Sequence, residues 1–169
     1  GEMVQRAAET GQSLGLKKSY GMDISSGANE AAREELDGLG MSERAEIVEG
    51  SILNEEDLKG LADRISGVGI DLRNVVATIN FILHDVGYKA AKEFLRNYAE
   101  IFGDAPLIVT ETMKMSPEVL RAHPNYQAMS FQFMHTASGQ ELFTEPEILA
   151  LFVRCGFNIL AREVHCYFQ

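Results

Sequence analysis

The sequence predicts an α/β protein with a doubly wound, mainly parallel sheet. Short apolar, β-rich runs alternate along the chain with longer segments whose apolar residues recur at helical spacing. The runs at 75–79 and 106–110 are almost continuously apolar, which is typical of parallel strands covered on both faces. Alternation of this kind favours right-handed β-α-β crossovers, with helices on both sides of one sheet.

The expected elements follow one another from residue 2 onward. They are a helix at 2–14, a strand at 18–23, a helix at 28–39, a strand at 45–48, a helix after residue 54, a strand at 74–80, a helix at 88–102, a strand at 106–110, a helix at 144–154, and strands at 157–161 and 164–168. Gly38 lies where the second helix ends, Asn54 can cap the third, and Pro146 suits the first turn of the last. The two final strands are expected to form an antiparallel hairpin about Arg162 and Glu163.

The segment 113–141 interrupts this alternation. It contains Pro117 and Pro124 and is longer than an ordinary connection between a strand and a helix. We expect an irregular insertion that covers the carboxyl ends of the strands, within a single domain that spans residues 1–169. Four apolar side chains in it are expected to form a pocket wall or lid, or else to pack in the core: Met129, Phe131, Phe133 and Met134.

Composition excludes several classes of function. The 169 residues are 46% hydrophobic, and the formal net charge of −10 argues against a nucleic-acid or anionic membrane surface, which needs clustered Lys and Arg. Cys155 and Cys166 lack the spacing of a disulfide framework or a zinc site, which favours a reducing, cytoplasmic setting. No run approaches the roughly 18–20 apolar residues that span a bilayer, and no signal peptide opens the chain.

Polar side chains stand where the expected strands end. Asp23 ends one strand, Asn80 ends another and is followed by His84 and Asp85, and Glu111 follows a third. Ligands of open α/β sheets bind outside the carboxyl ends of the strands, so these residues are the candidates for chemistry. Glu111 could line such a site or have only a structural role.

Four segments carry a family resemblance: YGMDIS at 20–25, EGSIL at 49–53, NFILHD at 80–85 and LIVTET at 107–112. In this order they resemble the Rossmann-like methyltransferases that use S-adenosylmethionine, whose sheet ends in an antiparallel hairpin. The resemblance implies a cofactor site at Asp23, Ile24, Ser51, Ile52, Asn80 and Phe81. In the family, the acid at the position of Asp23 binds the ribose. The loop at the positions of Ser51 and Ile52 holds the adenine, and the strand end at Asn80 and Phe81 lines the methionine part of the cofactor.

The start of the chain departs from the family pattern. The family opens with a strand and a Gly-x-Gly-x-Gly turn, of which Gly1 would be the last glycine. That strand lies between the strands that here end at Asp23 and Asn80, and a sheet without it has unpaired edges inside its core. We therefore expect a missing N-terminal segment or a complementary chain to supply it. The resemblance also implies a homodimer.

His84 and His135 together resemble the branch of the family that methylates the β-carbon of 2-oxo acids. In that branch, two histidines at these positions hold a divalent or trivalent metal ion, with iron or zinc the best candidates here. A metal that polarises the ketone of a small 2-oxo acid would assist its enolisation. Asp85 could orient a metal-bound water, support a histidine or take the proton.

Three alternatives stay open at this point. His84 could simply bond a neighbouring loop, and His135 by itself could be structural. The chain could instead be a small-molecule O-methyltransferase. It could also be a non-catalytic subunit or dimerisation module with the methyltransferase fold.

Overall fold

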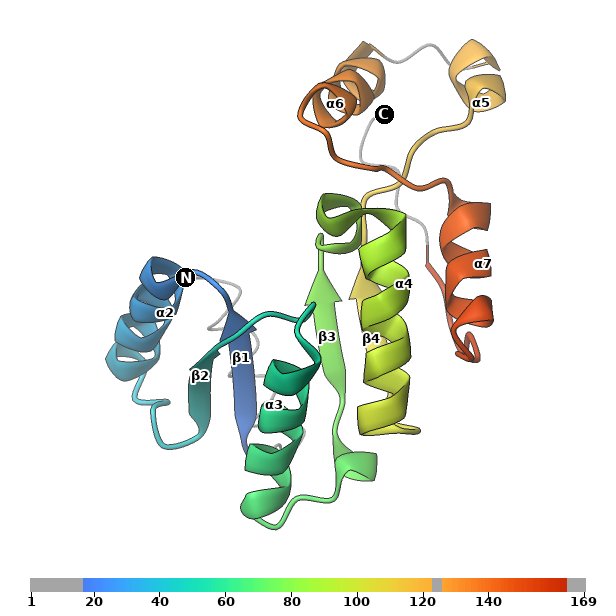
Figure 1. Ribbon diagram of the computed structural model, residues 1–169. Helices are drawn as coiled ribbons and strands as arrows, with labels where there is room; N and C mark the ends of the chain where they lie inside the picture. Colours follow the sequence, from blue (N-terminus) through green and yellow to red (C-terminus); the bar gives the residue numbers. More distant parts are fainter. Residues whose placement is uncertain (1–16, 123–125, 164–169) are drawn as a thin grey trace. The chain divides into compact units, whose positions relative to one another are not determined.

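The computed structural model describes residues 17–122 and 126–163 (Figure 1). The chain divides into two compact units, Gly1–Leu61 and Ala62–Gln169. In each unit, parallel strands joined by helical crossovers confirm the α/β alternation expected from the sequence. The helix expected at 2–14, the strand expected at 164–168 and the candidate Gly1 lie outside the described residues.

The first unit is built on two parallel strands. β1 (Ser19–Asp23) pairs with β2 (Ala45–Glu49), in register from Ser19 opposite Ala45 to Asp23 opposite Glu49. The crossover between them is α2 (Ser26–Gly38), which contacts both strands and begins at Ser25, whose Oγ accepts the N–H of Ala28 at 3.2 Å. Next comes α3 (Glu55–Gly67), and its expected cap is confirmed because Asn54 Oδ1 accepts the Glu56 N–H at 3.0 Å.

The second unit repeats this arrangement around a second strand pair. After a short 3-10 helix η1 (Leu72–Asn74), β3 (Ala77–Asn80) leads into α4 (Leu83–Phe102) and then β4 (Leu107–Thr110). β3 and β4 pair in parallel from Ala77 opposite Leu107 to Asn80 opposite Thr110. The fully buried core of the second unit includes the following side chains: Leu83, Ala91, Phe94, Leu95 and Leu151.

The expectation that β3 is buried on both faces is wrong for the part of the chain that the structure describes. Ile79 is buried, whereas its neighbours Thr78 and Asn80 are exposed. Successive side chains of a strand point to opposite faces, so the core of this unit covers one face of the pair and leaves the other open. On β4, Ile108 is exposed in the same way.

The segment 113–141 is helical, not irregular. It contains α5 (Pro117–Ala122) and α6 (Tyr126–Ala137), and α7 (Glu145–Arg154) follows it. Pro117 is the first residue of α5, a position that lacks a helical hydrogen bond in any case. The two ends of the segment lie side by side, since Met113 bridges Phe143 and the Lys114 N–H donates to the Phe143 carbonyl at 2.7 Å.

The helix expected at 88–102 is confirmed as the second piece of α4, which follows a short first piece that begins at Leu83 and ends at the non-helical Gly87. The end of the chain differs from the expectation. The structure assigns no strand at 157–161, and the partner strand at 164–168 lies outside the described residues. A strand is stable only beside a neighbour, so the hairpin stays a prediction.

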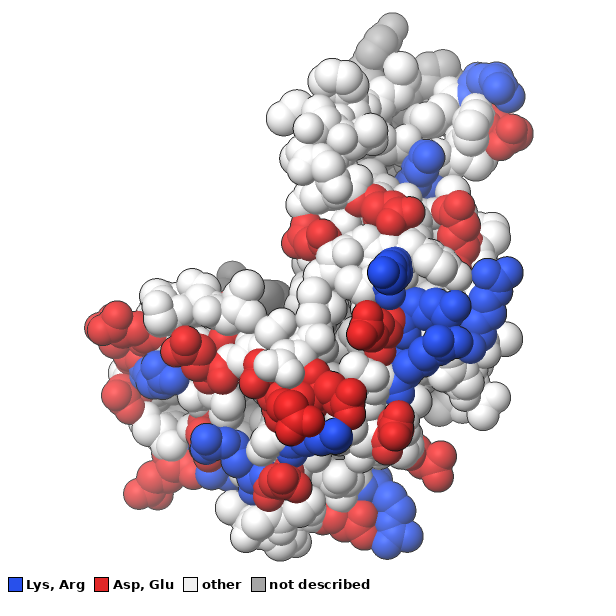
Figure 2. Space-filling view, in the orientation of Figure 1, with Lys and Arg blue, Asp and Glu red and all other residues white. Residues whose placement is uncertain are grey.

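Basic side chains gather over α4 and α7 in an otherwise acidic protein (Figure 2). Cys155, a free thiol directly after α7, lies near Lys92 and Arg96 of α4. Burial raises the pKa of the Cys155 thiol, and these two cations oppose that rise. Within 17–122 and 126–163, no helix is both long and apolar enough to cross a membrane.

Candidate active site

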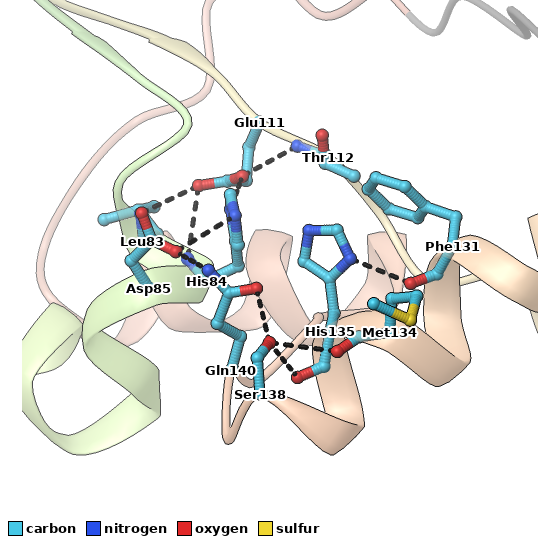
Figure 3. A network of polar contacts seen from close by, with 10 residues as sticks. All are labelled: Leu83, His84, Asp85, Glu111, Thr112, Phe131, Met134, His135, Ser138 and Gln140. Carbon is cyan, nitrogen blue, oxygen red and sulfur yellow. Dashed lines mark hydrogen bonds and ion pairs between the residues drawn. The ribbon is translucent and has the colours of Figure 1, made fainter.

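A buried carboxylate organises the start of α4. The helix has no side-chain cap of its own at Ile82. Instead Glu111, directly after β4, accepts the backbone N–H of Leu83 at 2.8 Å and that of His84 at 3.4 Å through its Oε2 (Figure 3). The first N–H groups of a helix lack partners within it, and its N-terminal end favours negative charge, so Glu111 serves as a cap from a remote segment.

The same carboxylate fixes the imidazole of His84. Oε1 of Glu111 lies 2.6 Å from Nδ1 of His84 and also accepts the N–H of Thr112 at 2.7 Å. His84 is 6% exposed and the Glu111 side chain 4%. Because an ionised carboxylate only accepts hydrogen bonds, Nδ1 carries the proton, and in the neutral ring the lone pair is at Nε2.

His135 is held in a similar way on α6. Its Nδ1 lies 2.8 Å from the backbone carbonyl of Phe131, so it too donates from Nδ1 and keeps its lone pair at Nε2. The rings of His84 and His135 have centroids 5.3 Å apart and planes inclined by 59°. The structure therefore brings together the two histidines that the sequence singled out, on elements far apart in the chain.

Asp85 belongs to a second set of polar contacts beside this pair. Its Oδ1 lies 3.4 Å from Nε2 of His84 and accepts a hydrogen bond from Nε2 of Gln140. The hydroxyl of Ser138 donates to Oε1 of Gln140 at 3.1 Å (Figure 3). Asp85 is thus joined to the segment that follows α6.

The donor set fits a metal ion only in part. Among the described residues, no group of three or more His, Cys, Asp or Glu side chains is arranged to hold a metal. His84 and His135 nevertheless match the pattern of metal-binding histidines, which donate their other ring N–H to a carboxylate or a backbone carbonyl. At most, these two side chains could serve as ligands, and the other positions would fall to substrate and water.

The apolar residues of α6 divide into two groups. The ring centroid of Phe131 lies 3.9 Å from that of His135, so Phe131 packs against this histidine. Core packing, the alternative weighed for this set, is wrong for the other three, since Met129, Phe133 and Met134 are exposed.

In the first unit, the loops that carry the expected ribose and adenine contacts lie together. The backbone carbonyl of Asp23 accepts the N–H of Gly50 at 3.1 Å and the side-chain amide of Asn29 at 2.9 Å. The Asp23 carboxylate accepts the N–H of Ser25 at 2.7 Å, while the following Ile24 is exposed. Asn29 is only 2% exposed, so this buried amide positions the end of β1.

The loop after β2 is held by another carboxylate. Oδ2 of Asp57, from the first turn of α3, accepts the N–H of Ser51 at 2.9 Å. A Cβ at Gly50 would lie 3.2 Å from Asp57 Cβ and 3.3 Å from Met22 Cε, so a larger residue there would push against both. Ile52 follows in the same loop and is half-buried.

In the second unit, Asn80 and Phe81 stand at the end of β3. Asn80 is its last residue and is exposed. Phe81 donates its N–H to the carbonyl of Thr110 at 2.8 Å and has a φ of 57°, which is uncommon for a residue other than glycine. This backbone turns the chain from β3 into α4 and leaves the Phe81 ring half exposed.

The sequence did not single out several residues that organise these sites. They are Asn29, Asp57, Gln140 and Glu141, while Glu111 was undecided between two roles. The acidic position of Glu111 at a strand end was a usable signal. The others carried none, because their partners lie in other elements.

No protein-family model matches the chain, and no curated protein matches it in sequence. Among solved structures, it is similar to an O-methyltransferase family protein from Burkholderia thailandensis, with a TM-score of 0.58 and 18% identity over 87% of this chain and 40% of that one. It is also similar to a structure described as PigF with SAH, with a TM-score of 0.55 and 22% identity over 88% of this chain and 39% of that one. The chain thus spans about two fifths of either protein, and at these identities the likeness shows the fold, a partial Rossmann-like methyltransferase fold.

Proposed function

We propose that this chain belongs to an S-adenosylmethionine-dependent methyltransferase that acts on the β-carbon of a small 2-oxo acid. One observation carries the proposal. The ring centroids of His84 and His135 lie 5.3 Å apart, and each ring donates its Nδ1 proton to a fixed acceptor. Both Nε2 lone pairs would therefore be available to bind one metal ion.

The cofactor side rests on the fold and on the strand ends. SAH, named with PigF, is S-adenosylhomocysteine, which remains when S-adenosylmethionine has given up its methyl group. Asp23 would bind the ribose hydroxyls, and the loop of Ser51 and Ile52 would hold the adenine. Asn80 and Phe81 would line the methionine part. Asn29 and Asp57 support this assignment because they hold these two loops in place.

The histidine pair would hold a metal ion such as iron or zinc, which when bound would polarise the substrate ketone and make the neighbouring C–H bond more acidic. Glu111 keeps His84 in the tautomer that presents Nε2. Asp85, which is joined to Gln140 through Oδ1, would use its other oxygen to take the proton from the β-carbon or to orient a water. The carbon would then attack the methyl group in line with the sulfur, so positioning is the main contribution of the fold.

The test is elemental analysis of protein purified without chelators, followed by methyl transfer from labelled S-adenosylmethionine to a panel of 2-oxo acids. His84→Ala and His135→Ala should each lose both metal and turnover. Val153→Ala on α7 is a matched control, since this side chain is exposed and makes none of these contacts. Unchanged metal content and turnover in both histidine variants would overturn the proposal.

A second candidate, a small-molecule O-methyltransferase, is favoured by the contact between Glu111 and His84. A histidine that donates Nδ1 to a buried carboxylate presents Nε2 as a general base for a hydroxyl group. This reaction needs His84 and Glu111 but neither His135 nor a metal. If His135→Ala methylates a phenol or alcohol at the wild-type rate while His84→Ala does not, the second candidate is correct.

We also propose that another segment, a complementary chain or a second copy completes the sheet. In the described residues β1 pairs only with β2 and β3 only with β4, so each pair keeps open edges with unpaired N–H and C=O groups. The expected result is that the 169-residue chain by itself fails to bind S-adenosylhomocysteine in calorimetry. Binding with micromolar or better affinity would contradict this proposal.

A further inference from the structure

Helix α4 is interrupted one turn after it begins. Gly87 has φ 75° and ψ 169°, far from helical values, so 83–86 and 88–102 are separate helical pieces, each with its own N-terminal end. Glu111 caps the first piece at Leu83. The second piece is capped by another remote carboxylate, because the N–H of Tyr88 donates to Oε2 of Glu141 at 2.7 Å.

Glu141 holds the helix on both sides of the break. Besides its side-chain contact with Tyr88, its backbone N–H donates to the carbonyl of His84 at 2.9 Å. The fit around Gly87 is close, since a Cβ there would lie 3.1 Å from Oε2 of Glu141. The positive φ requires glycine at position 87, and a Cβ there would also push against the Glu141 carboxylate.

The residues just before Glu141 extend the connection to α6. The N–H of Gln140 donates to the carbonyl of His135 at 2.9 Å, and its side-chain amide donates to Asp85. The Oγ of Ser138 also lies 3.0 Å from the carbonyl oxygen of His135 (Figure 3). A short path of hydrogen bonds therefore runs from the start of α4 to the C-terminal end of α6.

This connection matters because the part of α6 whose side chains are described, from 129 to 137, contributes little packing. None of these side chains is buried, and Met129, Phe133 and Met134 are exposed. With so little buried apolar surface, this part of the helix depends on the contacts at its end for its position. Its C-terminal end is the one joined to α4, so a loss there would release His135.

We infer that Glu141 is a positioning residue that holds α6, and with it His135, opposite His84. Its negative charge at the N-terminal end of 88–102 is favourable, and it is also the acceptor that the Tyr88 N–H needs. The consequence for catalysis rests on the proposed function of the histidine pair. The structural consequence does not, and can be measured without any activity.

The experiment compares Glu141→Ala with Glu141→Gln, whose amide oxygen can still accept the Tyr88 N–H. Amide hydrogen exchange should be roughly tenfold or more faster at 131–137 and at Tyr88 in Glu141→Ala, the factor that the loss of one hydrogen bond to a charged group implies. Exchange at Phe94 and Leu95 in the core should stay unchanged. Glu141→Gln keeps the acceptor without the charge and should restore most of the wild-type protection, while the control Glu100→Ala, an exposed acid on the same helix, should behave like the wild type.

Two further variants and an activity measurement complete the test. If Glu141→Ala does not fold, Glu141→Asp withdraws the acceptor by one methylene and serves in its place, and Gly87→Ala should release α6 in the same way. The kcat of the proposed methyl transfer should fall with the release of α6 and recover in Glu141→Gln. Unchanged exchange of α6 in Glu141→Ala, or no rescue by Glu141→Gln, would overturn the inference. Release of α6 without turnover in any form of the protein that binds S-adenosylhomocysteine, the wild type included, would instead overturn the proposed function alone.

Discussion

Nδ1 of His84 lies 2.6 Å from Oε1 of Glu111, and both side chains are almost fully buried. The other oxygen of the same carboxylate caps α4 at Leu83. One side chain therefore both starts the helix and sets the tautomer of its second residue. Glu111 therefore contributes both to the stability of α4 and to the chemistry open to His84.

Glu111→Ala should destabilise the protein because it leaves buried donors at Leu83 and His84 without an acceptor. The free energy of unfolding should fall by about 1–3 kcal/mol for each buried donor left without an acceptor. Urea unfolding followed by circular dichroism measures it. Glu118→Ala on α5 is the control, since that acid is exposed and should change stability by less than about 0.5 kcal/mol. Equal midpoints for the two variants would show that the contact contributes nothing.

Asp23→Asn should weaken the binding of S-adenosylhomocysteine by roughly tenfold or more, the effect of replacing a charged hydrogen-bond acceptor. The carboxylate lies at the end of β1 and, within the described part of the chain, accepts one backbone N–H, that of Ser25, so it has capacity left for the ribose hydroxyls. Calorimetry on a form of the protein that binds the ligand provides the measurement. Glu30→Gln on the exposed side of α2 is the matched control, and equal affinities would remove Asp23 from the site.

Glu147 should make the stability of α7 depend on pH. Its carboxylate accepts the backbone N–H and the hydroxyl of Thr144, each at 2.8 Å, and these hydrogen bonds lower the pKa of Glu147. Because the pKa of Glu147 is lowered in the folded state, its stabilisation is fully present at pH values above the ordinary carboxyl pKa. This stabilisation is lost as the pH falls through the folded-state pKa. The melting temperature of Glu147→Gln should therefore lie below that of the wild type at neutral pH and approach it in acid. A constant difference across that range would contradict the assignment.

Tyr98 should titrate late. Burial raises the pKa of its phenol to about 12, and its hydroxyl lies 3.3 Å from the carbonyls of both Ala105 and Pro106. A raised folded-state pKa means that the associated stability is complete below the ordinary value near 10 and is lost as pH rises toward about 12. Ultraviolet titration should show one phenol that ionises only with alkaline unfolding, and Tyr98→Phe should lack that step. A full titration below pH 11, roughly one unit above the ordinary phenol value, would contradict the burial argument.

Features that depend on neighbouring residues could be predicted from the sequence. The alternation of strands and helices, the cap at Asn54, the start of the last helix at Thr144 and the polar ends of β1 and β3 all agree with the structure. Hydrophobic period and capping chemistry are local properties, so one sequence carries them. The pairing of His84 with His135 was foreseen from a family resemblance, because spacing by itself does not bring two segments together.

The tertiary structure decided everything that depends on contacts between distant segments. The start of α4 at Leu83 depends on Glu111, which accepts its N–H, and Glu141 caps the helical piece that begins after Gly87. α6 is a helix where the sequence indicated irregular chain. In each case a carboxylate or a carbonyl from another element satisfies backbone groups that the local sequence leaves open. The sequence determined which residues could do chemistry. The fold decided which of them are in contact, because a hydrogen bond between distant segments cannot be predicted from the residues next to either partner in the sequence.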